Sequence, residues 1–122
     1  MDLNSVIRIV AVVKIDPADR VRFESMVKDL RNVVEEEGTS KVLTYDCYFK
    51  NESTCEYLIT EDYADEAAFL DHLRLIAPIS AKHNLSMEVH QFYLCGSLSP
   101  GTLQMFETAY HEKFVHYGAR IW

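Results

Sequence analysis

A histidine on a predicted helix is the first candidate for a catalytic base. His72 falls between Phe69 and Ile76 at three- and four-residue spacing, on the apolar stripe of that helix. Partial desolvation on the stripe favours the neutral imidazole, which is the form that accepts a proton. The alternative is a core histidine whose ring nitrogens hydrogen-bond to the backbone.

A carboxylate, Glu61, is the second candidate catalytic group. Strand parity places it on the same face as Tyr57 and Tyr63. A carboxylate on such an apolar face must be paired or hydrogen-bonded, because its pKa otherwise rises. We expect Glu61 to orient a histidine or to hold a substrate hydroxyl, and an ion pair with an arginine of a neighbouring strand, such as Arg8, is the structural alternative.

Tyrosines are concentrated in the later predicted strands. Their rings provide flat apolar walls with a polar tip, which suits a planar aromatic substrate, whereas core and interface packing is the alternative for most of them. The tyrosines concerned are Tyr45, Tyr48, Tyr57, Tyr63 and Tyr93. We predict that Tyr45, Tyr57 and Tyr63 bind substrate.

The remaining histidines and the cysteines carry weaker signals. We include His83 among the predicted substrate-binding residues, although its place beside Lys82 and Asn84 also predicts a solvated side chain. His90 alternates with Val89 in the last predicted strand and could face the same pocket. No Cys/His spacing typical of a metal site is present, so no metal is predicted. Three cysteines cannot all pair, and free thiols in a reducing cytoplasm are the plain interpretation.

The elements that must position these residues follow from the apolar periodicity. They are a strand over 6–15, a helix from the Asp16-Pro17 cap to Gly38, a hairpin of strands 42–50 and 55–63, a helix that begins at Asp65 and is interrupted by Pro78, and a strand over 87–95. This order, βαββαβ, is the ferredoxin-like α+β plan, which we assign to residues 1–98. Apolar residues on both faces of the strands, Val10 and Val12 opposite Ile9 and Val13, predict a dimer interface.

The C-terminal segment, residues 99–122, is predicted to be a helical extension of the same domain. Ser99-Pro100 forms a cap followed by a proline at the first helical position. An apolar and aromatic stripe then runs along one expected helix through Leu103, Phe106, Tyr110, Phe114 and Tyr117. Packing on its own sheet, packing on a partner subunit and roofing a pocket are the three roles that the pattern leaves open.

Charge and hydropathy exclude several classes of function. Nineteen acidic side chains against twelve basic ones give a net charge of -7, which argues against a nucleic-acid or anionic-membrane partner. The longest apolar run, residues 9–13, is too short to cross a bilayer, and no signal peptide is readable, so a cytoplasmic location is expected.

One stretch resembles a known family. From Tyr57 to Leu73 the chain reads YLITEDYADEAAFLDHL, with Glu61 and His72 eleven residues apart. This is similar to the antibiotic biosynthesis monooxygenase (quinol monooxygenase-like) family, where a strand ending in Glu-x-aromatic is followed by an Asp-Glu-Ala-Ala helix start and a His-Leu pair. The resemblance covers about residues 6 to 95, and it implies a dimeric α+β barrel whose subunits each hold a pocket between sheet and helices.

The resemblance also implies a reaction. It indicates a cofactor-independent monooxygenase that oxidises a phenolic or hydroquinone-type aromatic with dioxygen, with His72 as base, Glu61 as its orienter or a substrate anchor, and Tyr45 and Tyr63 as walls or hydroxyl donors. No organic cofactor motif is present in the sequence. The alternatives are a proton-shuttling isomerase of a small keto compound, a haem-binding protein, and a non-catalytic dimeric ligand-binding module. A phosphorylated isomerase substrate would require Arg8, Lys14 or Arg74 in the pocket.

Overall fold

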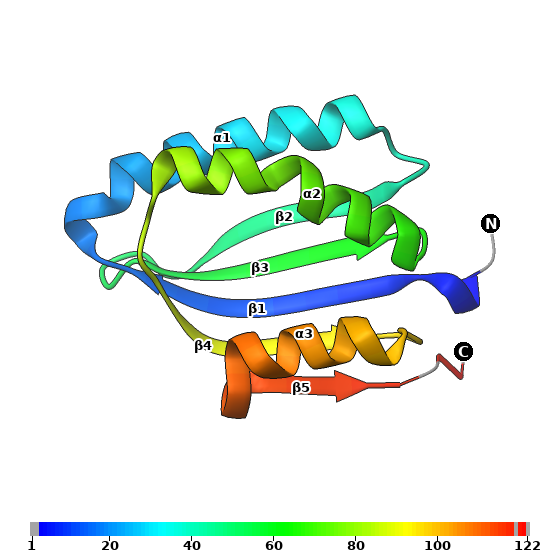
Figure 1. Cartoon of the computed structure of the whole chain (residues 1–122). Coiled ribbons are helices and arrows are strands. Elements are labelled where there is room, and N and C mark those ends of the chain that lie inside the picture. The colour runs from blue at the N-terminus through cyan, green and yellow to red at the C-terminus, as the bar shows by residue number, and fades with distance from the viewer. Residues whose placement is uncertain (1–2, 119, 122) are drawn as a thin grey trace.

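A five-stranded sheet with helices packed on one of its faces forms the protein (Figure 1). The computed structural model describes residues 3–118 and 120–121. The main elements are β1 (Ile7–Ile15), α1 (Arg20–Glu37), β2 (Val42–Asn51), β3 (Glu56–Tyr63), α2 (Glu66–His83), β4 (Met87–Cys95), α3 (Pro100–Tyr110) and β5 (Phe114–Tyr117). Short 3-10 turns lie at Leu3–Ser5, Pro17–Asp19 and His111–Lys113. This order confirms the predicted α+β fold, with a ferredoxin-like βαββαβ core followed by an additional helix.

The sheet is built around β1, in the order β2-β3-β1-β4-β5. All neighbouring strands are antiparallel except β4 and β5, which are parallel. The alternate residues of β1 from Ile7 to Ile15 are at most 5% exposed, because one face of a strand carries every second side chain. Phe23, Met26 and Leu30 of α1 pack on that face. The core therefore lies between the sheet and the helices.

Helix α2 differs from the prediction at Pro78. We expected the proline to interrupt the helix, and that was wrong: α2 continues to His83. The start is fixed by the Asp65 side chain, which accepts a hydrogen bond from the Ala68 N–H at 2.8 Å. A proline inside a helix removes one backbone hydrogen bond, but the hydrogen bonds of the other turns remain and α2 continues through Pro78. The helix ends where Asn84 adopts a left-handed conformation with φ 45°.

The C-terminal segment also differs from the prediction. The expected single helix through Phe114 and Tyr117 was wrong, because α3 ends at Tyr110 and His111 has a φ of 47°. The chain then forms β5, in which Phe114 pairs with Phe92 of β4. An aromatic and β-branched run next to an open sheet edge favours a strand, and the aromatic stripe alone does not distinguish the two structures.

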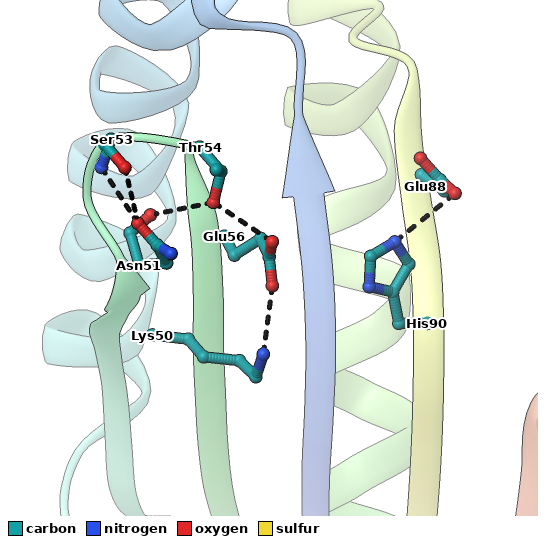
Figure 2. A network of polar contacts seen from close by, with 7 residues as sticks. All are labelled: Lys50, Asn51, Ser53, Thr54, Glu56, Glu88 and His90. Carbon is teal, nitrogen blue, oxygen red and sulfur yellow. Dashed lines mark hydrogen bonds and ion pairs between the residues drawn. The ribbon is translucent and has the colours of Figure 1, made fainter.

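In the described part of the chain, no helix covers the opposite face of the sheet. Val10, Val12 and Leu58 are only partly buried there, and Tyr48 is 55% exposed. Figure 2 shows polar side chains near the β2–β3 turn and on β4, including the Lys50–Glu56 ion pair at 3.0 Å and the His90–Glu88 pair at 3.3 Å. His90 thus contacts Glu88 rather than a pocket. Among the residues described, no helix is long and apolar enough to cross a membrane.

Candidate functional site

A cavity of about 750 Å³ lies between the sheet and the helices. Its floor comes from the inward residues of β1, and its walls come from α1, α2, β2, β3, β4 and α3. Most of the lining is apolar or aromatic, including Ile9, Val13, Phe23, Ile59, Phe92 and Phe106. A cavity of this size and composition is typical of a small-molecule site.

Glu61 supplies a carboxyl group to the cavity wall. It lies on the inward face of β3, where the Tyr63 hydroxyl donates a hydrogen bond to its Oε1. Burial raises the pKa of Glu61, while the Tyr63 hydrogen bond and the nearby His72 partly oppose that rise. The cavity therefore contains a carboxyl group whose proton affinity is higher than usual, which is a property of general acids and bases.

His72 lies behind this wall. Its side chain is fully buried, and within the described part of the chain it is not among the residues that line the cavity. Its Nδ1 is 2.8 Å from Oε2 of Glu37, and its ring is 5.2 Å from the Tyr45 ring and 5.1 Å from the Tyr63 ring. The structure thus brings His72 next to the site, in contact with Tyr45, which lines the cavity, and with Tyr63, which hydrogen-bonds to Glu61.

The three predicted tyrosines occupy different environments. Tyr45 lines the cavity, and burial followed by the charge of Glu61 raises the pKa of its phenol. Tyr63 is fully buried, and burial together with Glu61 also raises the pKa of Tyr63. Tyr57 packs on Phe23 with ring centroids 4.5 Å apart and does not appear in the cavity lining. Of the three tyrosines, only Tyr45 and Tyr63 interact with Glu61.

The structure places two further residues of the sequence analysis, His83 and Arg8, away from the cavity. His83 forms a contact of 2.8 Å between its Nε2 and Oδ2 of Asp29, outside the residues found to line the cavity. The alternative pairing of Glu61 with Arg8 was wrong, because the Arg8 Nε is 2.7 Å from Oδ1 of Asp62. Strand alternation explains this result, since Arg8 and Asp62 face away from the cavity while Glu61 faces into it.

Glu37 is a site residue that the sequence analysis missed. It is the last residue of α1, and its side chain is 4% exposed. A signal was present in the spacing, because Glu37 follows Met26, Leu30 and Val34 on the apolar stripe of the helix. The run Glu35-Glu36-Glu37 concealed it, since three consecutive acids suggest a solvated helix end.

Stacked aromatic rings form the far side of the cavity. Phe92 contacts the ring of Tyr110 at 4.6 Å and that of Phe106 at 5.2 Å, and Phe106 contacts Phe69 at 5.6 Å. Three of these rings, Phe92, Phe106 and Tyr110, come from β4 and α3. No group of three or more His, Cys, Asp or Glu side chains that could hold a metal ion is found in residues 3–118 and 120–121.

The fold and the site define a small α+β protein that encloses an apolar ligand cavity with a buried carboxyl group on its wall. The family model of the antibiotic biosynthesis monooxygenases matches residues 6–77. The chain belongs to this family, which confirms the resemblance found in the sequence. A search of curated proteins gives no match.

Solved structures show the same fold. MupZ from Pseudomonas fluorescens has a TM-score of 0.73 at 16% identity, and the match covers 98% of this chain and 93% of that one. A conserved protein from Methanosarcina mazei Go1 has a TM-score of 0.62 at 21% identity over 75% and 91% of the two chains. SnoaB from Streptomyces nogalater, a cofactor-independent oxygenase, has a TM-score of 0.61 at 12% identity over 78% and 95%.

Proposed function

We propose that the protein is a cofactor-independent monooxygenase that oxidises a phenolic or hydroquinone-type aromatic with dioxygen inside the cavity. The observation that carries this proposal is the Glu61 carboxyl on the wall of an aromatic-lined cavity, with its pKa raised by burial. Family membership supports the class of reaction, and SnoaB supports the absence of a cofactor by analogy.

In the proposed mechanism Glu61 is the base, because it is the candidate that lines the cavity. It removes a proton from the substrate, and the resulting delocalised anion passes one electron to dioxygen. The substrate radical and superoxide then combine into a peroxide. Loss of water from the peroxide leaves a carbonyl, so a CH₂ group and O₂ become C=O and H₂O, with all electrons supplied by the substrate. The protein contributes a base, alignment and exclusion of bulk water.

The other predicted site residues receive different roles in this proposal. His72 lies behind the wall and does not meet the substrate. Tyr45 lines the cavity beside Glu61, and the buried Tyr63 holds the Glu61 carboxyl group through its hydroxyl. Tyr57 and His83 have no part in it, since neither lines the cavity.

The experiment is oxygen uptake with a panel of hydroquinones, dihydroxynaphthalenes and anthrone-like phenols. Glu61→Gln should lower kcat by about 100-fold or more, as loss of a general base does. The matched control is Asp62→Asn, which changes the adjacent carboxylate on the opposite face and should leave kcat within about twofold. Uptake that survives Glu61→Gln would overturn the assignment of the base.

A proton-shuttling isomerase of a small keto compound is the second candidate. The raised proton affinity of Glu61 favours it equally, since such a carboxyl can both donate and accept a proton. Arg8 and Arg74 contact Asp62 and Asp71 instead of lining the cavity, so a phosphate anchored by these arginines is not part of this candidate. Turnover of a keto substrate under nitrogen, without oxygen consumption, would favour isomerisation.

We also propose that the protein acts as a homodimer. The partly buried Val10, Val12 and Leu58 and the exposed Tyr48 give the open sheet face an apolar surface, and a second copy would cover it. Light scattering should give twice the 14.1 kDa monomer mass, and Val12→Lys should reduce it to that of one chain.

A further inference from the structure

The cavity opens to solvent between α1 and β2. Most of the exposed residues in its lining belong to these two elements. The residues on α1 are spaced by three or four positions and therefore lie on one side of the helix. This opening includes Glu24, Lys28, Arg31 and Glu35 of α1 together with Asp46 and Tyr48 of β2. It is thus charged, in contrast to the apolar interior of the cavity.

The charges at the opening are not all paired. Glu24 accepts a hydrogen bond at 3.3 Å from an arginine one turn earlier in α1. Arg31 donates a hydrogen bond to the Tyr45 carbonyl oxygen, and its Nη1 is 3.9 Å from Oδ1 of Asp46. Lys28 forms no ion pair with any residue that the structure describes, although Glu24 lies at the favourable distance of four residues. Lys28 thus provides a positive charge that a ligand can neutralise.

The position of Lys28 relative to Glu61 follows from the packing of α1 on β2. Arg31 binds the backbone carbonyl of Tyr45, and Tyr45 pairs with Glu61 of β3. Lys28 lies three residues before Arg31, which is about 4.5 Å along the helix axis. An aromatic ligand that touches Glu61 can therefore place a substituent at the Lys28 ammonium while its rings remain inside the cavity.

The groups around Lys28 favour a ligand with a single negative charge. Glu35 and Asp46 also line the opening, and they repel a doubly charged phosphate more strongly than a carboxylate. A carboxylate at the opening keeps much of its hydration, so its binding there has a small desolvation cost. The aromatic body of the same ligand can enter the apolar interior. An aromatic acid therefore fits both parts of the site.

We propose that Lys28 is a specificity-determining residue that binds a carboxylate substituent of an aromatic substrate at the opening of the cavity. The identification of this ligand as a substrate rests on the proposed function. The binding itself requires no turnover, and it extends to an aromatic acid that cannot be oxidised.

Binding of anthracene carboxylates and of the matching carboxamides tests the proposal without turnover. Positional isomers present the acid at different edges of the same ring system, and the fluorescence of anthracene reports binding. At low ionic strength the wild type should bind the best carboxylate about fivefold more tightly than its carboxamide, as expected for a partly exposed ion pair. Added salt should reduce this difference. Lys28→Met, which keeps the length of the side chain and removes its charge, should abolish the preference.

Lys82→Met is the matched control for the loss of one positive charge. Lys82 is exposed on α2 and is not among the described residues that line the cavity, so this variant should keep the preference of the wild type. Equal affinity of the wild type for every acid and its amide would overturn the proposal. A preference that survives Lys28→Met would overturn it as well.

Rate measurements separate this inference from the proposed function. With an anthrone that carries a carboxylate, Lys28→Met should raise KM about fivefold and change kcat by less than about twofold, because the ion pair is present in the ground state and in the transition state alike. A carboxylate preference that depends on Lys28, in a protein that consumes no oxygen, would support the role of Lys28 and contradict the monooxygenase proposal. Oxygen uptake with uncharged anthrones and no carboxylate preference would support the proposed function and overturn the role of Lys28.

Discussion

The two sides of the cavity differ in what they contribute. On the β2–β3 side lies the polar end, in which Tyr45 and Glu61 line the cavity. Behind them lie Glu37, Tyr63 and His72, so this end buries two carboxyl groups near one histidine. On the β4–α3 side, the aromatic end consists of Phe69, Phe92, Phe106, Tyr110 and Phe114, whose rings contact one another. Burying carboxyl groups costs stability, whereas burying rings provides it.

The family comparison follows the same division. Every residue of the polar end lies within the segment 6–77 that the family model matches, while all of the aromatic end except Phe69 lies beyond it. The polar end therefore lies within the part of the chain that the family model matches, and most of the aromatic end lies in β4 and in the segment that follows it.

The largest effect is expected at the aromatic end. Phe92 is 8% exposed and contacts the rings of Phe106, Tyr110 and Phe114. Phe92→Ala should therefore lower the free energy of unfolding by about 3–5 kcal/mol in urea denaturation. Phe49→Ala is the control, since Phe49 is 47% exposed and its loss should cost less than about 1.5 kcal/mol. Equal losses would contradict the view that the aromatic end supplies the stability.

A smaller effect is expected from one hydroxyl of the polar end. Tyr63→Phe removes the hydrogen bond to Glu61 and should cost about 1–3 kcal/mol in stability. Because that bond lowers the pKa of Glu61, its loss should move the Glu61 titration to higher pH in carboxyl ¹³C NMR. Tyr57→Phe serves as the matched control: its buried hydroxyl has no partner among the described residues, so stability should not fall. If the two variants had the same stability and the same Glu61 titration, the Tyr63 hydroxyl would have no role in holding Glu61.

The smallest expected effect is a gain in stability when the Glu61 carboxyl group is removed. The pKa of Glu61 is raised in the folded protein, so the folded state binds more protons than the unfolded state between the two pKa values. The free energy of unfolding therefore falls as pH rises through that window. Glu61→Gln should be about 1 kcal/mol more stable than wild type at pH 8 and should lose this advantage near pH 4. A variant that is less stable at pH 8 would show that the carboxylate stabilises the fold.

Most of the core fold could be predicted from the sequence, because its periodicity is local. Alternation in residues 6–15 and the Asp65 cap specify a strand and a helix start without tertiary information, and strand parity correctly placed Glu61 on the inward face. The end of α3 could not be predicted in this way. The stripe that continues to Phe114 fits a helix, and the parallel pairing with β4 that makes it a strand is a tertiary interaction.

The candidate site was less predictable than the fold. His72 could be placed on an apolar stripe, but the identity of its partner depends on how α1 and α2 pack. Glu37 lies 35 residues away from it in the chain, and only their packing shows which acid of the run 35–37 is buried. The helix end at Asn84 and the contact of His83 with Asp29 depend on the same packing, which the loop-like sequence around His83 does not reveal.

The central claim is that substrate meets Glu61 at the polar end of this cavity. The most direct measurement is a crystal structure of the protein with an anthrone-like phenol, grown without oxygen so that no turnover occurs. We predict that a reacting hydroxyl or CH₂ group lies within about 3.5 Å of a Glu61 oxygen, with the rings of the phenol against Phe92 and Phe106. A phenol bound outside the cavity, or inside it with its reactive position directed away from Glu61, would contradict the account.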